Sequence, residues 1–173
     1  MTECSMAKIV IRDDCLAPDR YVRVKYSGPN PWGVAEFLND NLKQFFHVST
    51  SKVNNYRINW DITGDPITFY SRWWVNKEVG RFTIMRFVFK LYGEKGKTRN
   101  EGKFSLSYHA RVITEFGGWG PIMKPIWTLY SYLYFNRVRR KYIDKCRDYM
   151  VDFKNMIKEH FNVEATDFPT THA

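Results

Sequence analysis

Arginine and aromatic side chains alternate with apolar ones along the middle of this 173-residue chain, and their spacing suggests two kinds of binding chemistry. In an extended strand alternate residues face opposite sides, so each set shares a face. Arginines on one face can contact phosphates, and rings between them can stack on bases. Cross-strand pairing with carboxylates on a solvated face is the alternative explanation. The predicted nucleic-acid contacts are Arg57, Tyr70, Arg72, Trp74, Arg86 and Arg111.

The other set of alternating residues is apolar and rich in large rings. Rigid aromatic side chains can line a cavity for a hydrophobic or amphipathic small molecule, and hydroxyl groups can orient it. The alternative is that the rings pack on one another as an ordinary core. The strands are predicted to contribute Trp60, Ser71, Trp73, Phe87, Phe89, Leu106 and Tyr108, and the C-terminal helix Trp127, Tyr130 and Tyr134.

No motif in the sequence points to catalysis, a metal or a cofactor. The histidines show neither metal-ligand spacing nor an H-E-x-x-H pattern, and the cysteines do not complete a zinc signature. There is no G-x-S-x-G elbow and no glycine-rich phosphate loop. The sequence therefore predicts no catalytic residue and no cofactor. A cyclase- or hydrolase-like enzyme would need a carboxylate or histidine inside the cavity, which the alternation does not supply.

The formal net charge of +9 arises from 27 lysines and arginines against 18 acidic residues. This basic balance favours acidic partners, namely nucleic acid, an anionic membrane surface or an acidic ligand. The basic run Arg137–Lys141 follows the aromatic stretch Trp127–Phe135, an arrangement that suits transient contact with an anionic membrane. A helix with a buried aromatic stripe and a solvated basic face is the alternative. No obligate protein partner is predicted.

The three cysteines, an odd number without C-x-x-C spacing, make a disulfide framework unexpected and favour a reducing compartment. Residues 1–15 lack the apolar stretch of a signal peptide. The longest apolar run, residues 125–135, is too short to span a bilayer. These features predict a cytoplasmic protein.

The periodicity predicts one α+β domain over residues 1–173. Strand-like alternation covers residues 8–11, 20–26, 53–63, 67–78, 81–92 and 103–116. A short helix, N-capped by Asn30, is predicted over 32–47, and a long C-terminal helix over 126–161 with a kink near Asn136-Arg137. Short turns make the strands antiparallel. The core is predicted to span about residues 20–161, with 1–19 an arm or extra strand and 162–173 a flexible tail.

The segment Gly117-Gly118-Trp119-Gly120-Pro121 before a helix that carries Arg137-Val138-Arg139-Arg140-Lys141 resembles the end of cyclase-like domains. With the order of elements, it resembles the START/polyketide-cyclase-like superfamily (SRPBCC), whose fold is the helix-grip. The resemblance implies a sheet curved around the C-terminal helix, a short helical segment after the first strand and a cavity for a lipid, polyketide or quinone-like molecule. The predicted function is non-enzymatic binding or carriage of such a molecule, with nucleic-acid binding and an enzyme of the cavity as alternatives.

Overall fold

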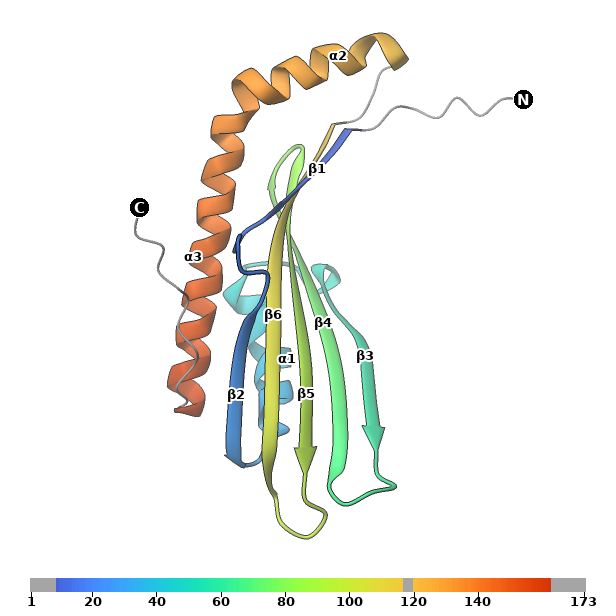
Figure 1. The fold of residues 1–173 in the computed structure, drawn as a ribbon, viewed down its shortest axis with the longest axis vertical. Helices are drawn as coiled ribbons and strands as arrows, with labels where there is room; N and C mark the ends of the chain where they lie inside the picture. The colour runs from blue at the N-terminus through green and yellow to red at the C-terminus, as the bar shows by residue number, and fades with distance from the viewer. Residues whose placement is uncertain (1–8, 117–119, 163–173) are drawn as a thin grey trace, which may run out of the picture.

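The computed structural model describes residues 9–116 and 120–162, and in the second range it describes side chains from residue 125 onward. Within these ranges the protein has an α+β fold, in which a six-stranded antiparallel sheet precedes a long C-terminal helical segment (Figure 1). This confirms the predicted α+β class with an antiparallel sheet and a long C-terminal helix. The predicted tail beyond residue 162 and the Gly117-Gly118-Trp119 turn lie outside the described residues.

The sheet is organised around its longest strand, β6. Strands β5, β4 and β3 follow it on one side, while β1 and β2 share its other edge. Strand β2 pairs with residues 101–108 of β6, and β1 pairs with residues 111–116. The strands are β1 (Ile9–Asp14), β2 (Val22–Pro29), β3 (Val53–Asp61), β4 (Ile67–Gly80), β5 (Thr83–Lys95) and β6 (Glu101–Phe116).

Helix α1 (Gly33–Phe45) follows β2 and lies within the range 32–47 predicted for a short helix, whereas the chain between β1 and β2 makes a turn. The predicted N-cap is wrong. The helix begins after Trp32 without a side-chain cap, and Asn30 takes a positive φ of 49°. The Asn30 carbonyl oxygen accepts a hydrogen bond of 3.0 Å from the Gly33 N–H. A short 3₁₀ turn (Thr50–Lys52) then leads into β3.

The C-terminal segment is bent rather than straight. It consists of α2 (Gly120–Tyr130), the π-helical segment η2 (Ser131–Phe135) and α3 (Asn136–Phe161). A π-helical turn holds an extra residue and rotates the apolar stripe, and this one lies directly before Asn136, where the sequence predicted a kink. Helix α2 therefore runs across the end of the sheet while α3 runs alongside the strands (Figure 1).

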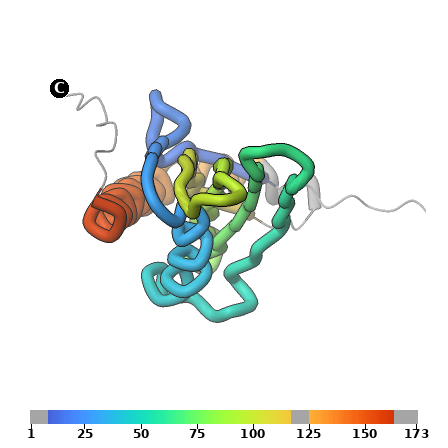
Figure 2. The backbone as a smooth tube through the Cα atoms, turned by 90° about the horizontal axis from the view of Figure 1, so that it is seen from below, coloured from blue at the N-terminus to red at the C-terminus, as the bar shows by residue number. Residues whose placement is uncertain are grey.

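Helices α1 and α3 pack against the same face of the sheet. Seen from below, α1 lies within the curve of the strands and α3 lies at the side of β2 (Figure 2). The ring of Phe46, at the end of α1, lies 4.2 Å from Phe87 of β5, and Phe153 of α3 lies 4.9 Å from Phe89. The buried residues of α3 recur every three or four positions and include Cys146, Met150, Phe153 and Ile157.

Cys15 and Cys146 form a disulfide with a Cα–Cα distance of 5.9 Å, which overturns the expectation that the chain has no disulfide. The bond joins the end of β1 to the middle of α3 across 131 residues of sequence. Both side chains are fully buried in the core. The sequence pattern failed here because pairing depends on distance in the fold, not on spacing along the chain.

A candidate anion-binding face on the open side of the sheet

The strand residues predicted to line a cavity form the centre of the packed core. The Phe89 ring lies 5.6 Å from Tyr108 and 4.9 Å from Phe153 of α3. The Trp73 indole donates a hydrogen bond of 2.7 Å to Asn39 on α1. The chain's own rings thus occupy the space in which the ligand was expected. The predicted residues that are buried are Ser71, Trp73, Phe87, Phe89, Leu106 and Tyr108.

Two polar groups lie among these rings. The Ser71 hydroxyl donates a hydrogen bond of 3.1 Å to the Arg57 carbonyl, so it stabilises the β3–β4 edge rather than facing a ligand. The Tyr108 hydroxyl is buried and has no hydrogen-bond partner among the described residues. Burial raises the pKa of Tyr108, so this phenol stays protonated at neutral pH.

The remaining cavity residues are not gathered with the others. Trp60 is exposed on the edge strand β3. Trp127 stacks on Phe116 at 5.2 Å, at the end of the sheet where β6 leads into α2. Tyr130 and Tyr134 are exposed. The prediction that these helix residues face the strand residues across one cavity is wrong, because the bend at η2 directs α2 away from the inner sheet face.

The opposite, outer face of the sheet carries the basic strand residues and is not covered by any described helix (Figure 2). On this face like charges stand directly opposite each other across the strands: Arg57 faces Arg72, Arg72 faces Lys90, and Arg86 faces Arg111. Such pairs repel each other and destabilise the sheet locally. An anion lying between them would remove this repulsion, so the register itself favours anion binding.

A hollow of about 330 Å³ lies among these arginines. Strands β1, β4, β5 and β6 all contribute to it, which brings together residues that are far apart in sequence. Two of its arginines already have neighbours: Arg86 donates a 2.9 Å hydrogen bond to Asn76, and Arg111 lies 4.0 Å from the Asp14 carboxylate. The residues that line this 330 Å³ hollow are Arg12, Arg72, Arg86, Val88, His109, Arg111, Ile113 and Glu115.

A second hollow, of about 290 Å³, shares Arg72, Arg86 and Val88 with the first and adds the rings of Tyr56 and Trp74. The Arg86 guanidinium lies 5.5 Å from the Trp74 ring, and that of Arg72 lies 6.0 Å from the Tyr56 ring. These cation–π contacts hold the arginine planes beside aromatic faces. The Trp74 indole nitrogen is buried without a hydrogen-bond partner among the described residues.

His109 of β6 lines the same hollow as the arginines, and its ring lies 4.9 Å from that of Tyr21. Its side chain is buried, with only 9% exposed, and its Nδ1 has no hydrogen-bond partner among the described residues. Burial, aided by the neighbouring Arg111, lowers the pKa of His109 to about 4, although Asp14 opposes this shift. The imidazole is therefore neutral at pH 7. A neutral imidazole with a free ring nitrogen can donate or accept one hydrogen bond in the hollow.

Four of the six predicted nucleic-acid contacts, Arg72, Trp74, Arg86 and Arg111, line these two hollows. Arg57 and Tyr70 lie on the same face by register, outside the two linings. Sequence reasoning missed Arg12 and Tyr56. The pairing of β1 with β6 has no local signal, and Tyr56 reaches the outer face because the register of β3 shifts between Asn55 and Arg57.

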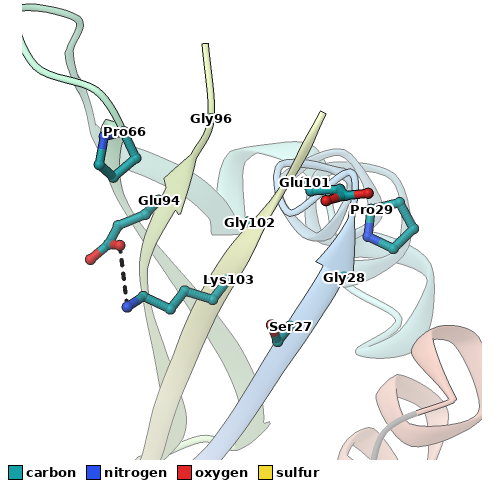
Figure 3. Close-up of a pocket in the computed structure, with 9 residues that line it drawn as sticks. All are labelled: Ser27, Gly28, Pro29, Pro66, Glu94, Gly96, Glu101, Gly102 and Lys103. Atoms are coloured by element: carbon teal, nitrogen blue, oxygen red, sulfur yellow. Dashed lines mark ion pairs between the residues drawn. The ribbon is translucent and has the colours of Figure 1, made fainter. Parts of the chain in front are cut away.

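A larger hollow, of about 490 Å³, lies at the far end of the sheet where β2 ends and β5 turns into β6 (Figure 3). Its walls are mostly glycine, proline and backbone. Its charged groups are the carboxylates of Glu94 and Glu101 and the amine of Lys103, which lies 3.3 Å from Glu94. Because charges of both signs line it, this hollow lacks the excess of positive charge that marks the arginine-lined face.

The described residues contain no cluster of three or more histidine, cysteine or acidic side chains that could hold a metal ion. No protein-family model matches this chain, and no curated protein matches it. The functional conclusion therefore depends on the geometry of the outer face.

Proposed function

We propose that this protein binds single-stranded nucleic acid across the outer face of its sheet. The observation that carries the proposal is the register, which sets Arg57 against Arg72, Arg72 against Lys90, and Arg86 against Arg111. A row of phosphates neutralises these like-charged pairs. The net charge of +9 adds long-range attraction for a polyanion.

The aromatic residues favour a single strand over other anions. Trp74 and Tyr56 each present a ring beside an arginine, and unpaired bases stack on such surfaces. In a duplex the faces of the bases are already stacked on each other. Ring contact therefore requires an unpaired strand.

The outer face offers a path longer than one nucleotide. From Arg86 and Arg111 the path follows β5 and β6 to a hollow of about 470 Å³. Lys25 and Tyr92 help to line this hollow, together with Lys103 and the Glu94 carboxylate that pairs with it. The stretch from residue 86 to residue 94 of β5 covers roughly 27 Å at ~3.4 Å per residue. A path of this length can hold about four nucleotides, the lower end of the range for sheet-based single-strand binders.

Fluorescence anisotropy with a labelled oligothymidylate, at increasing salt, tests the proposal. With about four phosphates neutralised and a slope of ~0.7 per phosphate, a fourfold rise in salt should weaken binding roughly fifty-fold. A duplex of the same length should bind more weakly, because its bases cannot stack on Trp74. Salt-independent binding, or none at low salt, would contradict the proposal, and equal affinity for the duplex would contradict its stacking part.

A second candidate is the predicted carriage of a hydrophobic or amphipathic small molecule between the sheet and α3. The unpartnered Tyr108 hydroxyl in the core supports it, since a polar group on a ligand would satisfy that hydroxyl, which has no partner among the described residues. We also propose a helix-grip fold and a likeness to the START/polyketide-cyclase-like superfamily. The antiparallel sheet and the long C-terminal helix support this proposal. Against it stands the packing of Phe89, Tyr108 and Phe153, whose rings would have to separate.

A further inference from the structure

The segment 126–138, called here the apolar arm, exposes an unusual number of large apolar side chains. It covers the end of α2, all of η2 and the start of α3. Seven of its side chains have exposed fractions between 38% and 77%. A soluble surface rarely gathers so many neighbouring apolar side chains without a partner. They are Ile126, Leu129, Tyr130, Tyr132, Leu133, Tyr134 and Val138.

Contacts with the sheet hold the arm in this orientation. On its inner side Trp127 stacks on Phe116, and the ring of Phe135 lies 5.3 Å from that of Phe116. Arg139, just beyond the arm, forms an ion pair of 3.1 Å with Asp13 of β1. These contacts fix the inner side of the arm, and its exposed apolar side chains lie where α2 crosses the end of the sheet (Figure 1).

The stretch of sequence that contains the arm carries charges of one sign only. From Phe116 to Ile143 the sequence has five basic residues and no acidic one. Arg137, Arg140 and Lys141 are exposed directly beside the apolar set. Basic side chains flanking exposed leucine and tyrosine match an anionic lipid surface, where rings enter the interface and cations meet head groups.

We infer that the apolar arm docks this protein onto anionic membranes by shallow insertion. None of the described helices is long and apolar enough to cross a bilayer, so the arm lies in the plane of the interface. Tyrosine, which supplies three of the seven exposed side chains, is enriched at such interfaces. The inference uses residues other than those of the nucleic-acid proposal, so each can fail without the other.

Sedimentation with vesicles of phosphatidylcholine and phosphatidylserine at a ratio of two to one tests the docking. The variant L129S/L133S should lower the partition coefficient at least about tenfold, since two exposed leucines no longer enter the bilayer. The matched control I58S/I62S changes two similarly exposed aliphatic residues in and just after β3 and should bind like the unaltered protein. The variant R137Q/R140Q/K141Q should lower binding to anionic vesicles roughly hundredfold, at ~1 kcal/mol per charge.

Three results of the vesicle experiments would overturn the inference. The first is that the unaltered protein does not sediment with the anionic vesicles. The second is that L129S/L133S binds as well as I58S/I62S. The third is that vesicle binding depends on Arg72 and Arg86 instead of the arm. Analytical ultracentrifugation without vesicles tests whether the arm instead binds a second copy of this protein. If the unaltered protein self-associates but does not bind vesicles, and L129S/L133S does not self-associate, the arm is a dimer contact and the inference is likewise overturned.

Discussion

Replacing Arg72 and Arg86 together by glutamine should weaken binding of a short oligothymidylate about hundredfold. Both side chains line both arginine-bearing hollows, and both stand opposite another cation across the strands. A hydrogen bond to a charged group contributes about 1.5 kcal/mol or more, so losing two corresponds to roughly two powers of ten. The slope of log affinity against log salt should fall in magnitude by ~1.4, at ~0.7 per lost phosphate contact.

The control for this prediction is K43Q/K145Q. It removes the same two positive charges from exposed positions on α1 and α3, which lie on the helical side of the sheet. Fluorescence anisotropy should give this variant nearly the affinity of the unaltered protein. Equal losses in the two variants would show that only net charge matters, and would refute a site on the outer face. Thermal unfolding followed by circular dichroism checks that both variants stay folded.

Removing the Cys15–Cys146 disulfide, as C15A/C146A, should lower the free energy of unfolding by about 3 to 5 kcal/mol. The bond closes a loop with a sequence separation of 131 residues, and long loops lose the most entropy when the unfolded chain is cross-linked. Denaturant unfolding of the two proteins under non-reducing conditions measures the difference. Reduction of the unaltered protein should give a similar decrease.

Alkylation of the denatured, non-reduced protein checks the bond itself. With the disulfide intact only Cys4 should react, whereas all three thiols should react after reduction. Three reactive thiols before reduction, or unchanged stability after it, would contradict the bond. A structural disulfide is typical of oxidising compartments and of intracellular proteins of hyperthermophiles. It therefore weighs against the reducing cytosol that the cysteine count predicted, and the cytoplasmic location stays a prediction.

The alternation of residues was enough to predict most of the sheet. In β4, β5 and β6 one alternating set of side chains is mostly apolar, and the same set faces the core because a strand alternates strictly. The other alternating set, which carries the arginines, was therefore predicted correctly to share the outer face of the sheet. The alternation also separated the adjacent tryptophans Trp73 and Trp74, one inward and one outward.

What the sequence could not show depends on contacts between distant residues. Alternation alone places Tyr56 with Ile58 and Trp60, but the register shift in β3 turns it to the outer face. The position of Arg12 beside the hollow depends on β1 joining β6 next to β2. Periodicity cannot tell rings that line a cavity from rings that fill it, so the contact of Phe153 with Phe89 could be learned only from the fold.

The two adjacent tryptophans of β4 provide the most direct measurement, because each reports one side of the sheet. The Trp73 indole is buried and bonded to Asn39, whereas the Trp74 indole lines the outer hollow without such a partner among the described residues. In a ¹H–¹⁵N spectrum, with signals assigned by W73F and W74F, an oligothymidylate should shift the Trp74 indole signal and leave that of Trp73 in place. A shift of the Trp73 signal alone, or of neither, would contradict binding on the outer face.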